Sequence, residues 1–177
     1  MGMRPIILYI ASSLDGFIAR EKGEIDWLPT QGEFGYNEFL ASVDTIIMGR
    51  KTYELCLSFP EWHYSGKKCY VLTHNTEKMK PDARVEFISD GIALANRLQR
   101  QKSKKNIWIL GGGQVVGLFL NAHLIDELRV FVVPKLIGKG IPLFQGIKKD
   151  ISLQLMKSHA FPEGLVELHY SLAQKSH

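Results

Sequence analysis

The chain has 177 residues, of which 45% are hydrophobic and 23% charged. This length and balance suit one soluble globular domain with a substantial core and argue against a disordered chain. The net charge of +4 is small, and the lysines and arginines are scattered, so nucleic acid is not expected as a partner. We therefore interpret residues 1–177 as a single domain.

The compartment is indicated by the cysteines and by the first apolar segment. Cys56 and Cys69 form neither a C-x-x-C motif nor a disulfide framework, so reduced thiols in a cytoplasmic protein are expected. The apolar run at 6–11 is too short for a signal peptide or a membrane span, and no membrane partner is expected. The histidines lack paired spacing such as H-x-x-x-H, so no metal site is predicted.

Apolar runs and polar turns alternate along the chain. Strands are expected at 6–11, 43–48, 70–73, 85–88, 107–110 and 128–134, helices at 33–42, from 50, at 90–102 with Asp90 as N-cap and after 113, and a closing strand pair at 153–157 and 166–171. Strands joined through helices predict a mostly parallel sheet covered on both faces. The strand-rich C-terminal part predicts an antiparallel edge. The predicted fold is thus a three-layer α/β/α sandwich.

Two glycine turns stand where a predicted strand gives way to a helix. Gly111-Gly112-Gly113 follows the strand ending at Leu110, and Gly49-Arg50-Lys51-Thr52 follows Met48. The first N–H groups of a helix have no internal partners, and together with the helix dipole they attract anions. Glycine also lets a phosphate approach the backbone closely. Each turn alone fits an ordinary strand-to-helix connection equally well.

The pair of turns carries more information than either turn alone. In a parallel sheet both lie at the carboxyl ends of strands, where α/β proteins bind ligands. The bare glycine turn suits a pyrophosphate, whereas Arg50, Lys51 and Thr52 suit a separate phosphate. We therefore predict NADPH, the commonest ligand with both groups; the alternative is two ordinary turns with solvated basic side chains. A standard Rossmann domain is disfavoured, because its glycine fingerprint follows the first strand.

Several motifs resemble those of a known superfamily. Met48-Gly49-Arg50-Lys51-Thr52-Tyr53-Glu54 closely resembles the M-G-R-K-T-W-E stretch of dihydrofolate reductases, with Trp27-Leu28-Pro29 and the triple glycine in the same order. Ser13-Leu14-Asp15-Gly16, 124–128 (LIDEL) and 133–144 (VPKLIGKGIPLF) instead resemble the reductase domain of the bifunctional riboflavin-biosynthesis deaminase/reductase. The resemblance covers nearly the whole chain.

The resemblance implies a dihydrofolate-reductase-like fold, NADPH, and hydride transfer to a C=N or C=O group of a small pteridine- or pyrimidine-like heterocycle. Either dihydrofolate or 5-amino-6-(5-phosphoribosylamino)uracil would be such a substrate. The implied cofactor-binding residues are Gly49, Arg50, Lys51 and Thr52 for phosphates, Thr73, His74 and Asn75 for adenosine and its 2′-phosphate, Gly111, Gly112, Gly113, Gln114, Val115 and Val116 for the pyrophosphate, and Ala11 and Ile18 beside the nicotinamide. Asp15, Trp27 and Tyr53 would face the substrate. The riboflavin reductases also suggest a homodimer.

The candidate catalytic acids are Asp15 and Glu33. Asp15 would orient an amino-heterocycle or hold a water that supplies the proton. Glu33 would act only if its segment is shifted, because a general acid must reach the group that it protonates. Asp15 also fits an Asp-Gly turn, and Glu33 also fits an exposed carboxylate at a helix start. Dihydrofolate reductases carry a carboxylate directly after Leu-Pro, whereas residues 30–32 here are Thr-Gln-Gly. This departure motivates an alternative, a non-catalytic NADP(H)-binding sensor or ligand-binding module. Residues 36–40 also lack the cation with which riboflavin reductases would meet a ribose phosphate.

Overall fold

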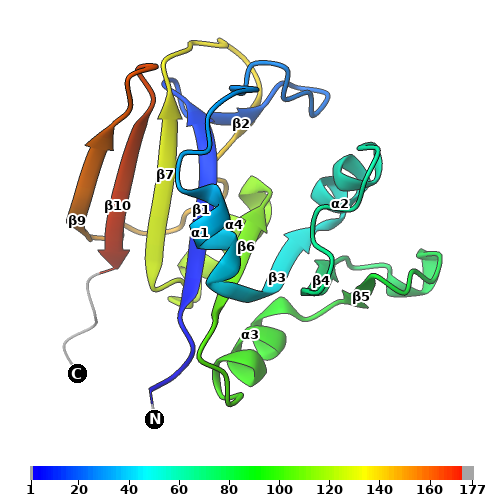
Figure 1. Ribbon diagram of the computed structural model, residues 1–177. Helices are drawn as coiled ribbons and strands as arrows, with labels where there is room; N and C mark the ends of the chain where they lie inside the picture. The colour runs from blue at the N-terminus through cyan, green and yellow to red at the C-terminus, as the bar shows by residue number, and fades with distance from the viewer. Residues whose placement is uncertain (1, 173–177) are drawn as a thin grey trace.

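The computed structural model describes residues 2–172 and is built around an eight-stranded sheet. The strands follow the order β5–β4–β3–β6–β1–β7–β10–β9 across it (Figure 1). The strands are β1 Ile6–Ser13, β2 Phe17–Ala19, β3 Val43–Gly49, β4 Lys68–Leu72, β5 Val85–Ile88, β6 Asn106–Gly111, β7 Glu127–Val133, β8 Ile141–Pro142, β9 Leu153–Ala160 and β10 Val166–Leu172. The helices are α1 Tyr36–Ala41, α2 Arg50–Leu57, α3 Gly91–Gln99 and α4 Gly113–Asn121, with a 3-10 turn at Thr76–Lys78. A short pair, β2 and β8, lies outside the main sheet.

The direction of the strands agrees with the prediction. Every pairing from β5 to β7 is parallel, and β7–β10 and β10–β9 are antiparallel. The mostly parallel sheet with an antiparallel C-terminal edge is therefore confirmed. The closing strand pair is also confirmed, although β9 continues to Ala160, beyond the predicted end at Lys157.

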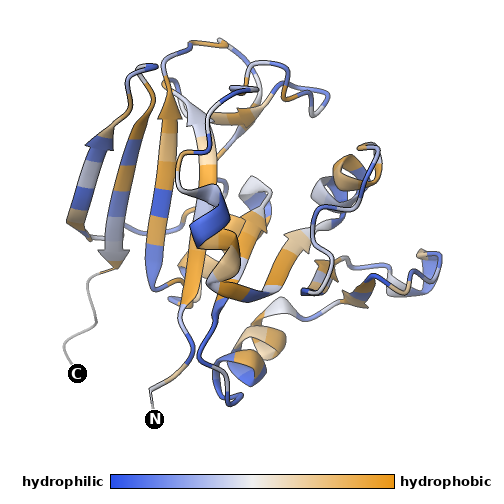
Figure 2. Ribbon diagram, viewed as in Figure 1, coloured by the Kyte–Doolittle hydropathy of each residue, from blue (hydrophilic) through white to orange (hydrophobic). Residues whose placement is uncertain are grey.

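Two apolar layers cover the sheet and confirm the three-layer sandwich. One layer packs α3 and α4 on the sheet, and the other packs α1 and α2 on its opposite face. The alternation of side chains along β6 shows why: Ile107 and Ile109 join the first layer, and Trp108 and Leu110 the second. Because the central strands are buried on both faces, their sequences are almost continuously hydrophobic (Figure 2).

The helix predicted at 33–42 is shorter than expected, because α1 begins only at Tyr36. Phe34 and Gly35 have φ angles of 47° and 76°, in the left-handed region, and residues in that conformation cannot extend a right-handed helix. Glu33 lies before this break. Its carboxylate accepts hydrogen bonds from the backbone N–H groups of Gly35 and Asn37, so it serves the start of the helix.

The other predicted helix with stated bounds, 90–102, spans Gly91–Gln99. Asp90 is its N-cap as predicted, with Oδ1 accepting a hydrogen bond from Ala93 N at 2.9 Å. After Gln99 the residues are polar or charged and exposed, so a longer helix would bury nothing more. Among residues 2–172, no helix has both the length and the apolar character needed to cross a membrane.

Candidate functional site

The two glycine turns lie in contact on one rim of the sheet, because β3 and β6 are neighbouring parallel strands. A Cβ placed on Gly49 would lie 3.1 Å from Val115 Cγ2 and 3.8 Å from Gly112 N. One placed on Gly112 would lie 3.6 Å from Thr52 Oγ1. The starts of α2 and α4 are therefore side by side, as a shared anion site would require.

Both helix starts leave backbone donors available to a ligand. Gly49 precedes α2 and Gly112 precedes α4, and neither helix has a side-chain cap. The first N–H groups of each helix therefore have no partner within the helix. In α3, by contrast, the Asp90 carboxylate fills this position. The peptide bond between Gly111 and Gly112 is cis.

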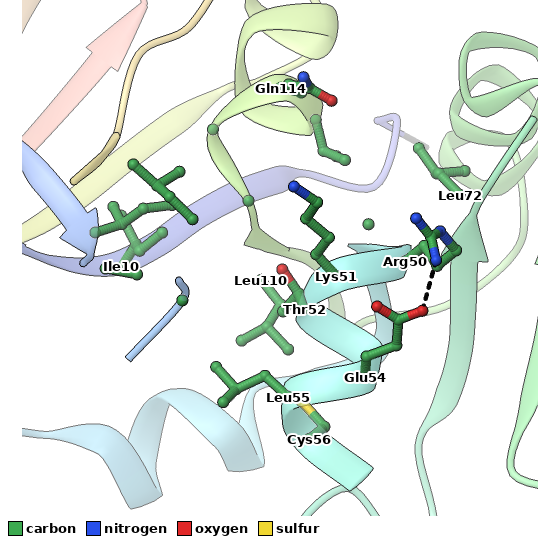
Figure 3. Close-up of a pocket in the computed structure, with 18 of the residues that line it drawn as sticks. Ile10, Arg50, Lys51, Thr52, Glu54, Leu55, Cys56, Leu72, Leu110 and Gln114 are labelled. Atoms are coloured by element: carbon green, nitrogen blue, oxygen red, sulfur yellow. Dashed lines mark hydrogen bonds and ion pairs between the residues drawn. The ribbon is translucent and has the colours of Figure 1, made fainter. Parts of the chain in front are cut away.

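A cavity of about 1510 Å³ opens beside these helix starts. Most ligand pockets measure about 300–1,000 Å³, so this one has room for a dinucleotide and a second molecule beside it. The predicted cofactor residues that line it are Ala11, Ile18, Gly49, Arg50, Lys51, Thr52, Thr73, His74, Asn75, Gly112, Gly113, Gln114 and Val115 (Figure 3). Residues from four separate segments of the sequence thus meet around one space.

The two cations of the first turn of α2 point to different parts of the cavity. Arg50 lies near Leu72, at the end of β4, whereas Lys51 reaches across toward the start of α4, where Gln114 lies (Figure 3). Arg50 Nη1 is 2.7 Å from Glu54 Oε1, and both side chains are about half exposed, at 49%. The Glu54 carboxylate therefore orients Arg50 while leaving it accessible from the cavity.

Asp15 does not line the cavity. Its carboxylate accepts hydrogen bonds from Ser13 Oγ at 2.6 Å, from Ile137 N at 3.1 Å and from Gly138 N at 2.7 Å. The Ser13 hydroxyl and then these backbone groups lower the pKa of Asp15, because they favour the charged carboxylate. Asp15 thus ties the turn after β1 to the segment after β7. A lowered pKa is also the opposite of what a proton donor at neutral pH needs.

Glu33 also lies outside the cavity lining, exposed before α1 with its oxygens on backbone N–H groups. The structure therefore brings neither of the two predicted acids to the cavity wall.

Four further predicted residues lie behind the cavity wall. Trp27 is 2% exposed and belongs to the core under α1 and α2, although its neighbour Leu28 lines the cavity. Tyr53 is buried, and its hydroxyl donates a hydrogen bond to Asp82 Oδ2 at 2.6 Å. Successive helical residues point about 100° apart, so Tyr53 turns inward when Thr52 faces the cavity. The other two, Gly111 and Val116, are buried and do not line the cavity.

A wall of aromatic side chains on the α1 and α2 side of the sheet was not predicted from the sequence. The rings of Tyr36 and Tyr64 lie 6.1 Å and 5.7 Å from Trp108, both roughly edge-on. We call the part of the cavity that they line the aromatic compartment. Its lining residues are Tyr9, Leu28, Tyr36, Leu55, Cys56, Tyr64, Trp108 and Leu110. The available signal was the spacing of Trp108 and Leu110, which places both on one face of β6.

Charge is confined to the mouth of the cavity. Among the described residues, every acidic, basic or histidine side chain that lines it is exposed. These are Glu21, Lys22, Arg50, Lys51, Glu54 and His74. The lining of the aromatic compartment is buried or half-buried instead. The cavity thus joins a charged, phosphate-compatible outer part to an apolar inner part.

Comparisons with known proteins identify a family and several relatives of this chain. A family model described as the RibD C-terminal domain matches residues 60–167. The chain is 40% identical over 171 residues to the uncharacterized protein YwjB of Bacillus subtilis, with 94% of this chain and 97% of YwjB covered.

Two solved structures share its architecture. A Shewanella protein described as a riboflavin biosynthesis protein matches with a TM-score of 0.83 and 30% identity over 98% of this chain and 100% of that one. The Thermotoga maritima diaminohydroxyphosphoribosylaminopyrimidine deaminase/5-amino-6-(5-phosphoribosylamino)uracil reductase matches with a TM-score of 0.72 and 18% identity, over 97% of this chain and 57% of that one. The second match is evidence of a common fold.

Proposed function

Because this chain belongs to the RibD C-terminal domain family, we propose that it is an NADPH-dependent reductase that transfers a hydride to a small pteridine- or pyrimidine-like heterocycle. The reductase activity named for the Thermotoga maritima protein supports this class of reaction. The observation that carries the proposal is the pair of uncapped helix starts, with Arg50 and Lys51 beside them, on the wall of one large cavity.

The residues present fit such a cofactor. The N–H groups at the start of α4, from Gly113 to Val115, would hold the pyrophosphate, since they are free of side-chain caps. Arg50, which lies near Leu72 at the end of β4, would hold the 2′-phosphate, because the adenosine-side residues 73–75 directly follow Leu72 and line the same cavity. Ala11 and Ile18 would flank the nicotinamide. Bound NADPH would supply the hydride, while the protein orients the substrate and excludes water.

Calorimetric titration with NADPH, followed by NADPH oxidation at about 340 nm, tests the proposal. We expect saturable binding of NADPH and turnover on at least one member of a panel of pterins, pyrimidines and quinones. A purified protein that gives no binding heat with NADPH at millimolar concentration would contradict the reductase function.

A second candidate is a non-catalytic NADP(H)-binding sensor or ligand-binding module. The observation that favours it is the placement of Asp15 and Glu33 outside the cavity lining, which leaves neither predicted acid beside a bound ring. Tight binding of NADPH without turnover on any panel member would support this candidate over the enzyme.

The same proposal includes a cytoplasmic location. Cys56 and Cys69 are free and buried. Free thiols are typical of proteins in a reducing compartment such as the cytoplasm. Expression of a tagged chain followed by cell fractionation would check this expectation.

A further inference from the structure

The aromatic compartment offers a ligand few polar atoms. Its side chains contribute the hydroxyls of Tyr9, Tyr36 and Tyr64, the thiol of Cys56 and the indole N–H of Trp108. Among residues 2–172, no charged side chain lines this part of the cavity. A ligand that enters this compartment therefore replaces its contacts with water by contacts with aromatic rings and aliphatic carbon atoms.

Most of these polar atoms are already engaged. Trp108 Nε1 donates a hydrogen bond to the backbone oxygen of Tyr9 at 2.9 Å, and the Tyr9 hydroxyl donates to Phe34 O at 3.4 Å. The Tyr64 hydroxyl lies beside the Cys56 thiol. Among the described residues, one hydroxyl of the compartment is therefore left without such a partner.

The remaining group is the hydroxyl of Tyr36. Within residues 2–172 it forms no hydrogen bond, and it is not sealed in the core. The ring is fixed between Tyr9, at 6.3 Å, and Trp108, at 6.1 Å, so the hydroxyl has a defined place on the wall. Burial raises the pKa of Tyr36, which keeps the hydroxyl protonated and able to donate at neutral pH.

Building on the proposed function, we propose that the aromatic compartment binds an uncharged, planar, mainly apolar ring and that the Tyr36 hydroxyl donates a hydrogen bond to a carbonyl oxygen or ring nitrogen of that ring. Such a ring stacks against aromatic neighbours without losing strong hydration. A phosphorylated pyrimidine would bring a highly hydrated anion to a wall without a cation, which is costly. Lys22, the cation that lines the cavity beside Glu21 in the sequence, is exposed and is not part of the aromatic compartment.

The same placement gives Tyr36 a part in the reduction. Bound NADPH would supply a hydride, with its electron pair, to the carbon of the C=O or C=N bond and would become NADP⁺. The π electron pair moves to the oxygen or nitrogen, and that atom takes a proton. The hydrogen bond from the Tyr36 hydroxyl would polarise that bond, and the proton would come from water, because a tyrosinate at Tyr36 would be an anion on a wall without a cation.

Binding measurements on the intact protein test the ligand class. NADP⁺ is titrated first, and the saturated protein is then titrated with duroquinone and lumazine, two uncharged planar rings, and with uridine 5′-monophosphate. We expect each uncharged ring to bind at least about tenfold more tightly than the nucleotide. Equal or tighter binding of uridine 5′-monophosphate, or no binding of either ring, would overturn the proposal. Failure of NADP⁺ to bind would instead reject the proposed function.

A single-atom change tests Tyr36 itself. Tyr36→Phe should weaken binding of the two rings roughly three- to tenfold, the effect of one lost hydrogen bond, with unchanged NADP⁺ affinity and unfolding temperature. Tyr170→Phe, which removes a hydroxyl from β10 away from the cavity, is the matched control and should bind like the wild type. Ring binding that is the same in Tyr36→Phe and the wild type would show that this hydroxyl does not contact the ligand.

Discussion

Arg50 is the side chain on which the choice between NADPH and NADH should depend. It lines the cavity on the β4 side, and its ion pair with Glu54 keeps it in place (Figure 3). We predict that Arg50→Ala weakens NADPH binding about 10- to 100-fold, because a charge-assisted hydrogen bond to the 2′-phosphate is lost. NADH, which lacks that phosphate, should be affected far less.

Calorimetric titration of both cofactors measures this difference. Arg97→Ala removes an exposed arginine from α3, outside the cavity lining, and should change neither affinity. Equal weakening of NADPH and NADH by Arg50→Ala would mean that Arg50 does not bind the 2′-phosphate.

Asp15 illustrates how one residue can satisfy a catalytic and a structural interpretation of the same sequence. Its carboxylate holds the N–H groups of Ile137 and Gly138, so we predict that Asp15→Ala lowers the unfolding temperature. We also predict that kcat changes by less than about threefold, whereas loss of a general acid typically costs about 100- to 10,000-fold. Thermal unfolding and steady-state rates, measured together, would expose a catalytic role as a large loss of kcat.

At the scale of elements, Asp82 joins α2 to the segment before β5. Its Oδ2 accepts a hydrogen bond from the Tyr53 hydroxyl at 2.6 Å and pairs with Arg84 Nη2 at 2.7 Å. The Arg84 guanidinium above all, and the Tyr53 hydroxyl, hold the pKa of Asp82 well below its usual range. This contact also explains why Tyr53 faces inward rather than toward a substrate.

The pKa of Asp82 leads to a prediction for stability against pH. Because the folded pKa lies below the unfolded value of about 3.9, the stabilisation is fully present above that value and is lost as the pH falls toward the folded pKa. We predict that Asp82→Asn lowers the free energy of unfolding by about 1–2 kcal/mol at neutral pH and by progressively less below about pH 4. Urea denaturation of both proteins across this range measures the difference, and a constant difference would contradict the assignment.

At the scale of the whole molecule, β9 is an exposed edge that a partner would cover. All eight of its residues are exposed, and it is the last strand of the sheet. Leu155 and Met156 are 53% and 59% exposed. Natural proteins normally protect such apolar edges.

We therefore predict a homodimer that forms through β9. Sedimentation velocity should show a dimer for the wild type and a monomer for Leu155→Lys. Met3→Lys changes another strongly exposed apolar residue, far from β9 in the sequence, and should remain dimeric. A wild-type protein that sediments as a monomer at every concentration would contradict this prediction.

The sequence by itself determined the alternation of strands and helices, the antiparallel C-terminal edge and the two glycine turns on one rim. These features follow from patterns a few residues long, since apolar periodicity and glycine positions act through the local backbone. Parallel pairing then places both turns at the same edge of the sheet.

Only the tertiary structure decided what individual side chains meet. Asp15 finds its N–H partner 122 residues away, and the aromatic compartment combines Tyr36 of α1 with Trp108 of β6. Whether a carboxylate acts as an acid or as a clamp depends on these distant neighbours, which set its hydrogen bonds and its pKa. Short-range sequence patterns do not predict these distant neighbours, because the contacts form only when remote segments pack together.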